Sequence, residues 1–463
     1  MIPRLVCRLA LRFGCCAGVV GLWWLLAGCC LAQEITSEAD ALARLERLER
    51  EIEALRSEVA ARPESACPES PTREGEKPIP KEDVIKQIDQ RIASERWRHK
   101  GIIVRPYGMF WTSLVGSSSR FTPSDAALYM LPGEANGADL CTISARRSRV
   151  GLAIEDAHVD WFGGMEMSGK VEIDFMGELG TAENKPSVLL REVYWEAKND
   201  CFHFLIGQTK DVVSPLEPGM LNYYNLWCAG NVGYRNPQLR FERFVYWNCR
   251  TRMEIAASLS QLTGADFSSV DFSGSYPVVQ ARVGWTIARD TCRFPVQFGF
   301  SGHIGEQRYD FPSEELAIDT WSINFDFSVP LSDRCGIRGE IFHGQGLAGI
   351  YGGIEQSVDY SLTSGGSGRS IHSTGGWLEF WWDWTSKLRY CVGFGTDDPH
   401  DNDLETAQRR KNSVIYTNFT YEFTPFLRTG VEYAYWKTEY QIDTPGGEKG
   451  CANVIEWMWQ FEF

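Results

Sequence analysis

Apolar and polar residues alternate along most of the chain after residue 100. In VIEWMWQFEF, the last ten residues, isoleucine, tryptophan and phenylalanine alternate with glutamate, methionine and glutamine. A period of two places successive side chains on opposite faces of a β-strand. Two architectures explain such a strand: a soluble sandwich with the apolar face in its core, or a membrane barrel with the apolar face in lipid and the polar face in a wet lumen.

About sixteen segments show this alternation, and each is long enough to cross a bilayer at a tilt. They lie near residues 102–112, 141–154, 163–176, 187–198, 201–209, 236–244, 250–261, 276–288, 292–304, 318–330, 334–344, 374–384, 386–396, 411–424, 426–440 and 452–463. After residue 32 the sequence has no apolar run of the roughly 18 residues that a transmembrane helix needs. We therefore predict an all-β transmembrane barrel of about 16 antiparallel strands over residues 101–463.

The connections between these segments alternate between short and long. The short connections are AKNDC, ARDTC, PLSDRC, DWTSK and TPF, whereas the long, polar ones are 113–140, 208–235, 305–317, 345–373 and 397–410. Outer-membrane barrels have short periplasmic turns and longer external loops. A soluble sandwich has no reason to sort its loops in this way, so the pattern favours the membrane barrel.

The residues before the barrel predict an exported protein with a stalk. Residues 1–32 combine arginines with the apolar run GVVGLWWLLAG and end in Cys30-Leu31-Ala32, which is typical of a signal peptide. The preceding Leu26-Ala27-Gly28-Cys29 resembles a lipobox, so lipidation of Cys29 stays an alternative. The chain is therefore expected in the outer membrane, with its stalk in the periplasm.

Residues 33–62 contain a heptad pattern. Leu45, Ile52 and Val59 fall at position a, and Leu48 and Leu55 fall at position d. We predict a coiled coil here, with a single amphipathic helix as the alternative. Residues 63–100 are expected to form a Pro-rich linker and a second short helix, PKEDVIKQIDQRIASERW. A stalk of this kind would bring the chain into contact with peptidoglycan.

The net charge and the cysteine content further restrict the class of protein. The formal net charge is -15, which argues against nucleic-acid binding. Nine of the 14 cysteines follow the signal segment, and Cys201, Cys249, Cys292 and Cys335 lie at or near short turns. Alternate hairpin ends are about 10 Å apart, whereas a disulfide needs Cα atoms within about 7 Å. We therefore assign no disulfide pair.

No motif for catalysis or cofactor binding stands out. The seven histidines lack the spacing of a metal motif. GFSGH around Ser301 falls short of a nucleophile elbow. We expect no metal, no cofactor and no reaction.

The period-two pattern places many charged residues on the lumen side, where they avoid the about 2–4 kcal/mol that a midplane Arg or Lys costs in lipid. The basic ones are Arg105, Arg147, Arg149, Lys170, Arg240, Arg252, Arg282, Arg338, Arg389 and Arg428. The acidic ones are Glu172, Asp174, Glu192, Glu196, Glu242, Glu254, Asp326, Glu340, Glu379, Asp383, Glu432 and Glu456. We expect most of them to form salt bridges along the wall and the rest to shape the field in the pore.

Several local motifs carry a family resemblance. ISARRSRVGLAIE, REVYWEA and GQTKDVVSPLEPG followed by NVGYRNPQLR resemble segments of the DcaP-like family of Gram-negative trimeric porins, which begin with a coiled coil. The resemblance implies a homotrimer in outer-membrane lipid that passes small solutes, anions included. It also implies that the barrel-assembly machinery reads the terminal aromatic residues Trp459, Phe461 and Phe463.

The connection from Gln208 to Arg235 is the third external loop by strand order, and similar porins fold this loop inward. An inward loop would bring Lys210, Asp211 and Glu217 opposite the basic row Arg105, Arg147 and Arg149. An outward loop that caps the trimer is the alternative. The predicted pore constriction comprises Arg105, Arg147, Arg149, Lys210, Asp211, Glu217 and Arg235.

The sequence as a whole indicates an outer-membrane porin for passive diffusion of small hydrophilic solutes. Two alternatives stay open. One is a structural barrel with an occluded lumen that tethers envelope layers, and the other is an outer-membrane barrel enzyme.

Overall fold

The computed structural model describes the chain from Trp97 to its end, with gaps. The described residues are 97–99, 102–123, 125–133, 137, 139–177, 186–263, 276–289, 292–311, 314–358, 369–405, 408–441 and 447–463. They belong to the second of two units, 82–463. The expected signal segment and coiled coil lie outside them. Trp97, the last residue of the expected second helix, instead begins strand β1 (Trp97–His99), which pairs with β2.

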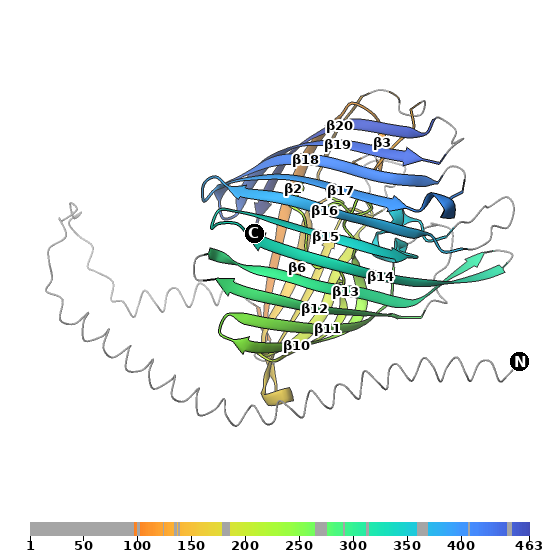
Figure 1. Cartoon of the computed structure of the whole chain (residues 1–463). Helices are drawn as coiled ribbons and strands as arrows, with labels where there is room; N and C mark the ends of the chain where they lie inside the picture. The colour runs from red at the N-terminus through yellow and green to blue at the C-terminus, as the bar shows by residue number, and fades with distance from the viewer. Residues whose placement is uncertain are drawn as a thin grey trace, which may run out of the picture. The chain divides into compact units, whose positions relative to one another are not determined.

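Sixteen antiparallel strands form one closed barrel (Figure 1). The strands are β2 (Ile102–Ser117), β5 (Leu140–Ser144) continued by β6 (Arg149–Val159), β7 (Met165–Asp174), β8 (Leu189–Lys198), β9 (Phe202–Lys210), β10 (Arg235–Asn248), β11 (Thr251–Ser260), β12 (Val278–Arg289), β13 (Cys292–Phe311), β14 (Glu314–Pro330), β15 (Cys335–Gln345), β16 (His372–Asp383), β17 (Leu388–Pro399), β18 (Arg409–Thr424), β19 (Leu427–Tyr440) and β20 (Lys449–Glu462). The connections contain β3 (Phe121–Thr122), β4 (Tyr129–Met130) and the 3-10 turns η1 (Trp161–Gly163), η2 (Ala348–Ile350), η3 (Gly353–Glu355) and η4 (Asp401–Asp403). Among the described residues, no helix combines the length and the apolar character needed to cross a membrane.

The last strand closes the barrel against the first. Phe461 of β20 lies opposite Phe110 of β2, and the pairing continues along both strands. Beyond it, the N–H and the carbonyl of Phe463 each hydrogen-bond with the backbone of Gly108 at 3.0 Å. The ring of Phe463 also packs on Phe110, with 5.0 Å between the ring centroids. The strand predicted from VIEWMWQFEF is thereby confirmed, and it closes the barrel.

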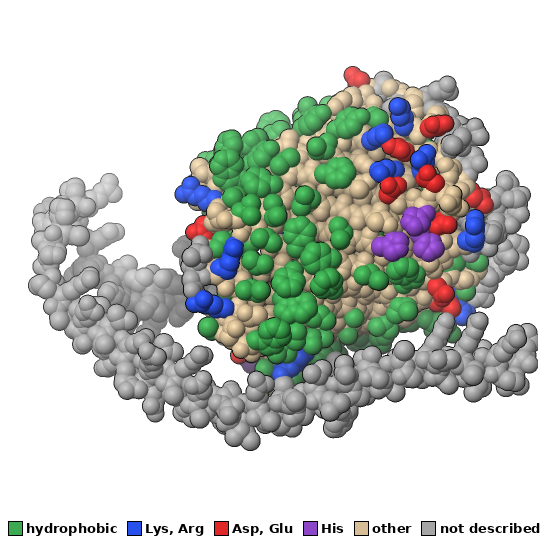
Figure 2. Space-filling model, in the orientation of Figure 1, with side chains coloured by type: hydrophobic (Ala, Val, Ile, Leu, Met, Phe, Trp, Pro, Cys, Tyr) green, Lys and Arg blue, Asp and Glu red, His purple; other side chains and the backbone are tan. Residues whose placement is uncertain are grey.

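The faces of β20 show which side of the barrel is wet. Trp457 and Phe461 are 44% and 41% exposed, whereas Glu456 and Met458, which alternate with them, are 6% and 1% exposed. Aromatic and aliphatic side chains form a broad band on the outside (Figure 2). An apolar exterior around a polar interior is the arrangement of a transmembrane barrel, so the soluble-sandwich interpretation is wrong.

The predicted segments coincide with the strands, and one predicted loop is wrong. Residues 305–317 were expected to form a long connection, but β13 runs to Phe311, β14 begins at Glu314, and the two pair at that point. Outside the apolar band, the outward face of a strand is solvated and can be polar. Glu306 and Arg308, for example, form an ion pair at 3.1 Å. A strand end of this kind resembles a loop in sequence.

The described cysteines do not form disulfides with one another. Cys141, Cys201, Cys228, Cys249, Cys292, Cys335, Cys391 and Cys451 are all free thiols.

Candidate functional site

The connection between β9 and β10, residues 211–234, lies inside the barrel. Five backbone N–H groups along it donate to polar side chains that project inward from five wall strands. The pairs are Val212 with Gln280 of β12 (2.9 Å), Ser214 with Ser301 of β13 (3.3 Å), Leu216 with Glu340 of β15 (2.8 Å), Gly219 with Glu379 of β16, and Leu221 with Glu432 of β19 (2.7 Å). Because buried N–H groups require acceptors, these wall side chains fix the path of the segment across the lumen. We call residues 211–234 the lumen loop.

The lumen loop also touches the wall through its backbone. Gly230 has a φ of 114°, and a Cβ atom there would lie 2.2 Å from the carbonyl oxygen of Gly376 in β16. Only glycine at position 230 permits both the left-handed conformation and this close approach. The loop is therefore an ordered part of the interior, and the alternative of an outward loop does not hold.

Two other connections pack against the lumen loop. Leu128 and Tyr129, from the connection after β2, share a buried apolar cluster with Trp227, Cys228 and Ile354. Hydrogen bonds join the same three segments: Asn222 Nδ2 to the Ala127 carbonyl (3.1 Å), the Cys228 N–H to the Tyr351 carbonyl (3.0 Å), and the Gly233 N–H to the Ile350 carbonyl (2.8 Å). These contacts hold the lumen loop from the side that faces the long connections.

A cavity of about 1030 Å³ opens on the other side of the lumen loop. It extends from Gly219 and Tyr223 of the loop to Arg334 and Lys387 in two of the short turns. Among the described residues that line it, twelve are Arg or Lys and six are Asp or Glu. The basic ones are Arg147, Arg149, Lys170, Arg191, Lys210, Arg235, Arg293, Arg334, Arg338, Lys387, Arg389 and Arg428. The cavity is thus positive, although the whole chain carries a net charge of -15.

Some of these cations are neutralised by carboxylates in the wall. Arg191 contacts Glu172 at 2.9 Å and Asp174 at 2.6 Å. Glu172 also contacts Lys170 at 3.3 Å and Arg149 at 3.6 Å, so this single carboxylate forms ion pairs with three cations. Lys170 also forms an ion pair with Glu192, so the three cations of this cluster are matched by the three carboxylates Glu172, Asp174 and Glu192.

Arg147 and Arg235 are held mainly by aromatic rings. Within the described part of the chain, neither forms a salt bridge with a carboxylate, and the Nε atom of each is buried without a hydrogen-bond partner. Arg147 instead stacks on Trp111, 3.9 Å from the ring centroid, and donates to the Leu221 carbonyl. Arg235 stacks on Tyr234 at 4.7 Å. The aromatic rings fix both guanidinium groups at the cavity.

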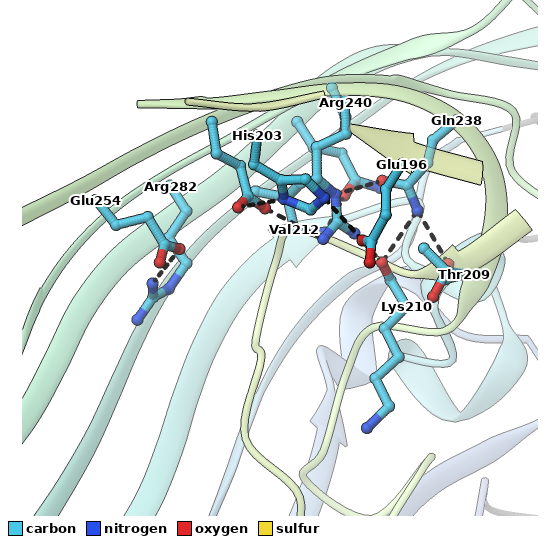
Figure 3. Close-up of polar contacts among 12 residues, drawn as sticks. Glu196, His203, Thr209, Lys210, Val212, Gln238, Arg240, Glu254 and Arg282 are labelled. Carbon is cyan, nitrogen blue, oxygen red and sulfur yellow. Dashed lines mark hydrogen bonds and ion pairs between the residues drawn. The ribbon is translucent and has the colours of Figure 1, made fainter. Parts of the chain in front are cut away.

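The rest of the wall is held by compensated pairs (Figure 3). His203 lies between two carboxylates, at 2.9 Å from Glu196 and 2.8 Å from Glu242. Arg282 contacts Glu254 at 3.3 Å and, outside the labelled group, Asp326 at 2.8 Å. These pairs match the expectation that lumen charges form wall salt bridges. The side chain of Lys210 points away from them (Figure 3).

Five of the seven residues predicted for the constriction line the cavity: Arg147, Arg149, Lys210, Glu217 and Arg235. Among the loop residues, Glu217 interacts electrostatically with Arg149 of the basic row, but its salt bridge is formed with Lys210. Lys210 pairs with Glu217 at 2.6 Å within the same connection. Burial alone would raise the pKa of Glu217, but the adjacent Lys210 outweighs this effect and holds it below the usual range. The two charges therefore cancel each other locally.

The other two predicted residues lie elsewhere. Arg105 pairs with Glu155 at 2.7 Å, and their side chains are 47% and 37% exposed. Asp211 is buried and accepts hydrogen bonds from the Tyr234 N–H (2.8 Å), Asn236 Nδ2 (2.9 Å) and Gln280 Nε2 (2.9 Å). Burial raises the pKa of Asp211 to about 6 because these bonds offset only part of the cost of burying a charge. Asp211 closes the base of the lumen loop and does not line the cavity.

Arg191 was not among the residues predicted to face the lumen, and the structure shows why. The register between β7 and β8 shifts between Glu172 and Ile173, which pair with Glu192 and Leu190 and leave Arg191 in a bulge. Both Arg191 and Glu192 are buried, although they are consecutive. A β-bulge interrupts the period of two, so strict alternation assigned Arg191 to the wrong face. An Arg-Glu pair inside an otherwise alternating strand is the signal that could have revealed the bulge.

Comparisons with solved structures agree with this geometry. The outer membrane channel DcaP of Acinetobacter baumannii matches with a TM-score of 0.64 and 17% identity, over 79% of this chain and 99% of that one. The barrel has the porin fold. Salmonella typhi OmpF, solved in complex with daunomycin, matches with a TM-score of 0.50 and 11% identity, over 79% and 100%. No family model and no curated protein matches the sequence.

Proposed function

We propose that this chain is an outer-membrane porin through which small hydrophilic solutes, and small anions in particular, diffuse passively. The observation that carries the proposal is the excess of basic over acidic residues around the cavity, twelve against six, in a chain that is acidic overall. Selectivity depends on the charges that line the pore and not on the total charge of the protein.

The fixed positions of the arginines favour diffusion of a solute through the cavity, and not its tight binding there. Arg147 and Arg235 are held by aromatic rings, and Lys210 by Glu217, so none of them needs to reorganise when a solute passes. Conduction requires attraction strong enough for entry and weak enough for exit. Several cations spread along one cavity satisfy this requirement better than one closed site.

The apolar outer band places the barrel in lipid, and the porin fold places it in a bacterial outer membrane. The homotrimer, the recognition of Trp459, Phe461 and Phe463 by the barrel-assembly machinery, and the contact of a periplasmic stalk with peptidoglycan belong to the same proposal. They rest on the sequence resemblance. We propose no catalytic role for this barrel.

A second candidate is the occluded barrel that tethers envelope layers. The apolar cluster around Tyr129, Trp227 and Ile354 favours it, because this cluster takes up space on the side of the lumen loop that faces the long connections. The two candidates differ in whether solutes cross the barrel.

Uptake into proteoliposomes distinguishes them. Purified full-length protein would be reconstituted, and the entry of labelled succinate would be compared with that of labelled putrescine, a dication of similar length. We expect succinate to enter several-fold faster. Equal rates, or faster putrescine entry, would overturn the anion preference, and no entry of either solute would support the occluded barrel.

A further inference from the structure

Three histidines from successive strands gather on the outside of the barrel. His343 lies in β15, His372 begins β16, and His400 directly follows β17. Strand pairing brings them together, since the His400 N–H donates to the His372 carbonyl at 2.9 Å. The ring centroids of His372 and His400 are 5.6 Å apart, and those of His343 and His400 are 6.0 Å apart. Figure 2 shows histidine side chains gathered between the apolar band and the charged residues near the end of the barrel.

A carboxylate completes the group. After β17 the chain turns through η4, where the Asp403 N–H donates to the His400 carbonyl at 2.9 Å. This turn brings Asp403 onto His372, whose backbone N–H and Nδ1 atom lie 3.2 Å and 3.0 Å from the Asp403 carboxylate. The carboxylate is therefore held beside the imidazole by the backbone as well as by the side chain.

We propose that His372, His400 and Asp403 bind a divalent transition-metal ion, with Zn²⁺ as the best match. Each residue offers one ligand atom, and these atoms all lie within 4.8 Å of one another. Zn²⁺ binds His nitrogen at about 2.0–2.1 Å and carboxylate oxygen at about 2.0–2.2 Å. Ligand atoms around one ion are thus separated by about 3–4 Å, so modest side-chain rotations close the site. Two imidazoles disfavour Mg²⁺ and Ca²⁺, which prefer oxygen ligands.

The site is open to water and separate from the pore. His400 is exposed, and His372 and Asp403 are partly exposed. Three protein ligands leave one tetrahedral position for water or another donor. None of the three residues lines the cavity. An ion here would join the start of β16 to the turn after β17, so we expect it to stabilise this rim of the barrel without changing the permeation path.

No sequence motif reveals this site, because its two histidines lie at opposite ends of the β16–β17 hairpin, far apart in the sequence. Metal motifs recognised in sequence place ligands a few residues apart on one helix or loop. Here the register of β16 with β17 sets the geometry: Ser373 pairs with Pro399, and the adjacent residues are the two histidines.

Calorimetric titration of Zn²⁺ into untagged, full-length, detergent-solubilised protein tests the proposal. We expect one Zn²⁺ per chain, retained in excess Mg²⁺, for the wild type and for the control His158→Gln, which removes an exposed histidine in β6. His372→Gln and His400→Gln should each weaken binding by more than tenfold, since even the loss of an outer-shell partner costs about 10–100-fold.

Heat-modifiable migration on gels would show that every variant is a folded barrel. Wild-type protein that takes up no Zn²⁺ would overturn the proposal. Site variants that bind with the affinity of the His158→Gln control would also overturn it. Neither outcome bears on the pore, because the proposed permeation function does not involve these residues.

Discussion

At the scale of single residues, the partners of an arginine decide what its charge can do. Arg105 pairs with the exposed Glu155, and Arg191 with two buried carboxylates, so the field of each is largely cancelled. Arg147 and Arg235 have aromatic partners instead, which hold the guanidinium group and leave its charge in place. The sequence distinguishes none of these environments, because they depend on contacts between distant strands.

Replacing the two aromatic-stacked arginines should therefore change selectivity. We predict that Arg147→Gln with Arg235→Gln lowers the ratio of anion to cation permeability several-fold, because it removes charges with no carboxylate partner. The measurement is the reversal potential under a salt gradient. Arg105→Gln is the matched control and should leave the potential at the wild-type value. An equal effect of both variants would contradict the assignment.

The terminal residue is expected to matter for assembly. Deleting Phe463 removes its two backbone hydrogen bonds with Gly108, each worth about 1 kcal/mol, and its ring contact with Phe110. We predict a sharp drop in folded barrel in the outer membrane, measured by heat-modifiable migration. Phe463→Tyr retains both the backbone and an aromatic ring, and should assemble normally. Normal migration of the deletion variant would show that neither feature is needed.

At the scale of elements, the sequence predicted the strands well and their ends poorly. Period-two alternation located the sixteen barrel strands, because lipid on one side and water on the other impose it on each strand. Period-two alternation failed as a guide where a strand leaves the lipid or where a bulge interrupts it. Beyond the apolar band, β13 and β14 continue with charged residues such as Glu306, Arg308 and Asp319 on the outward face. At the bulge before Glu192, two consecutive residues face inward.

The lumen loop was predicted only in outline. Strand order identified the third external loop, and the resemblance to trimeric porins implied that it folds inward. Neither indicated that Gln280, Glu340 and Glu432 would accept its N–H groups, because those residues are distant in sequence. For the same reason, the position of Asp211 at the base of the loop was not foreseen. The coiled coil over residues 33–62 stays a prediction, since it lies outside the described residues.

Shortening the lumen loop should widen the pore. Replacing residues 213–230 by a short Gly-Ser linker keeps Asp211 and its partners but removes the segment that crosses the lumen. We predict a higher single-channel conductance and weaker charge selectivity.

Gly116→Ala is a suitable control for a change in the wall, since a Cβ atom there meets nothing within 4 Å. It should leave conductance unchanged. If the loop variant retains wild-type conductance in a folded barrel, the narrowest part of the pore lies elsewhere.

At the scale of the whole molecule, acidic and basic residues are distributed unevenly between the cavity lining and the rest of the protein. The chain carries 61 acidic and 46 basic residues, yet basic residues dominate the cavity. Acidic side chains of the wall, such as Glu340 and Glu432, are buried as acceptors for the lumen loop and do not line the cavity. An acidic protein can in this way enclose a positive pore.

The most direct test of this account is single-channel recording of the wild-type protein in a planar bilayer under a KCl gradient. The account predicts stepwise openings and a reversal potential displaced towards the equilibrium potential of chloride. A barrel that inserts but gives no openings, or one whose reversal potential lies on the potassium side, would contradict it.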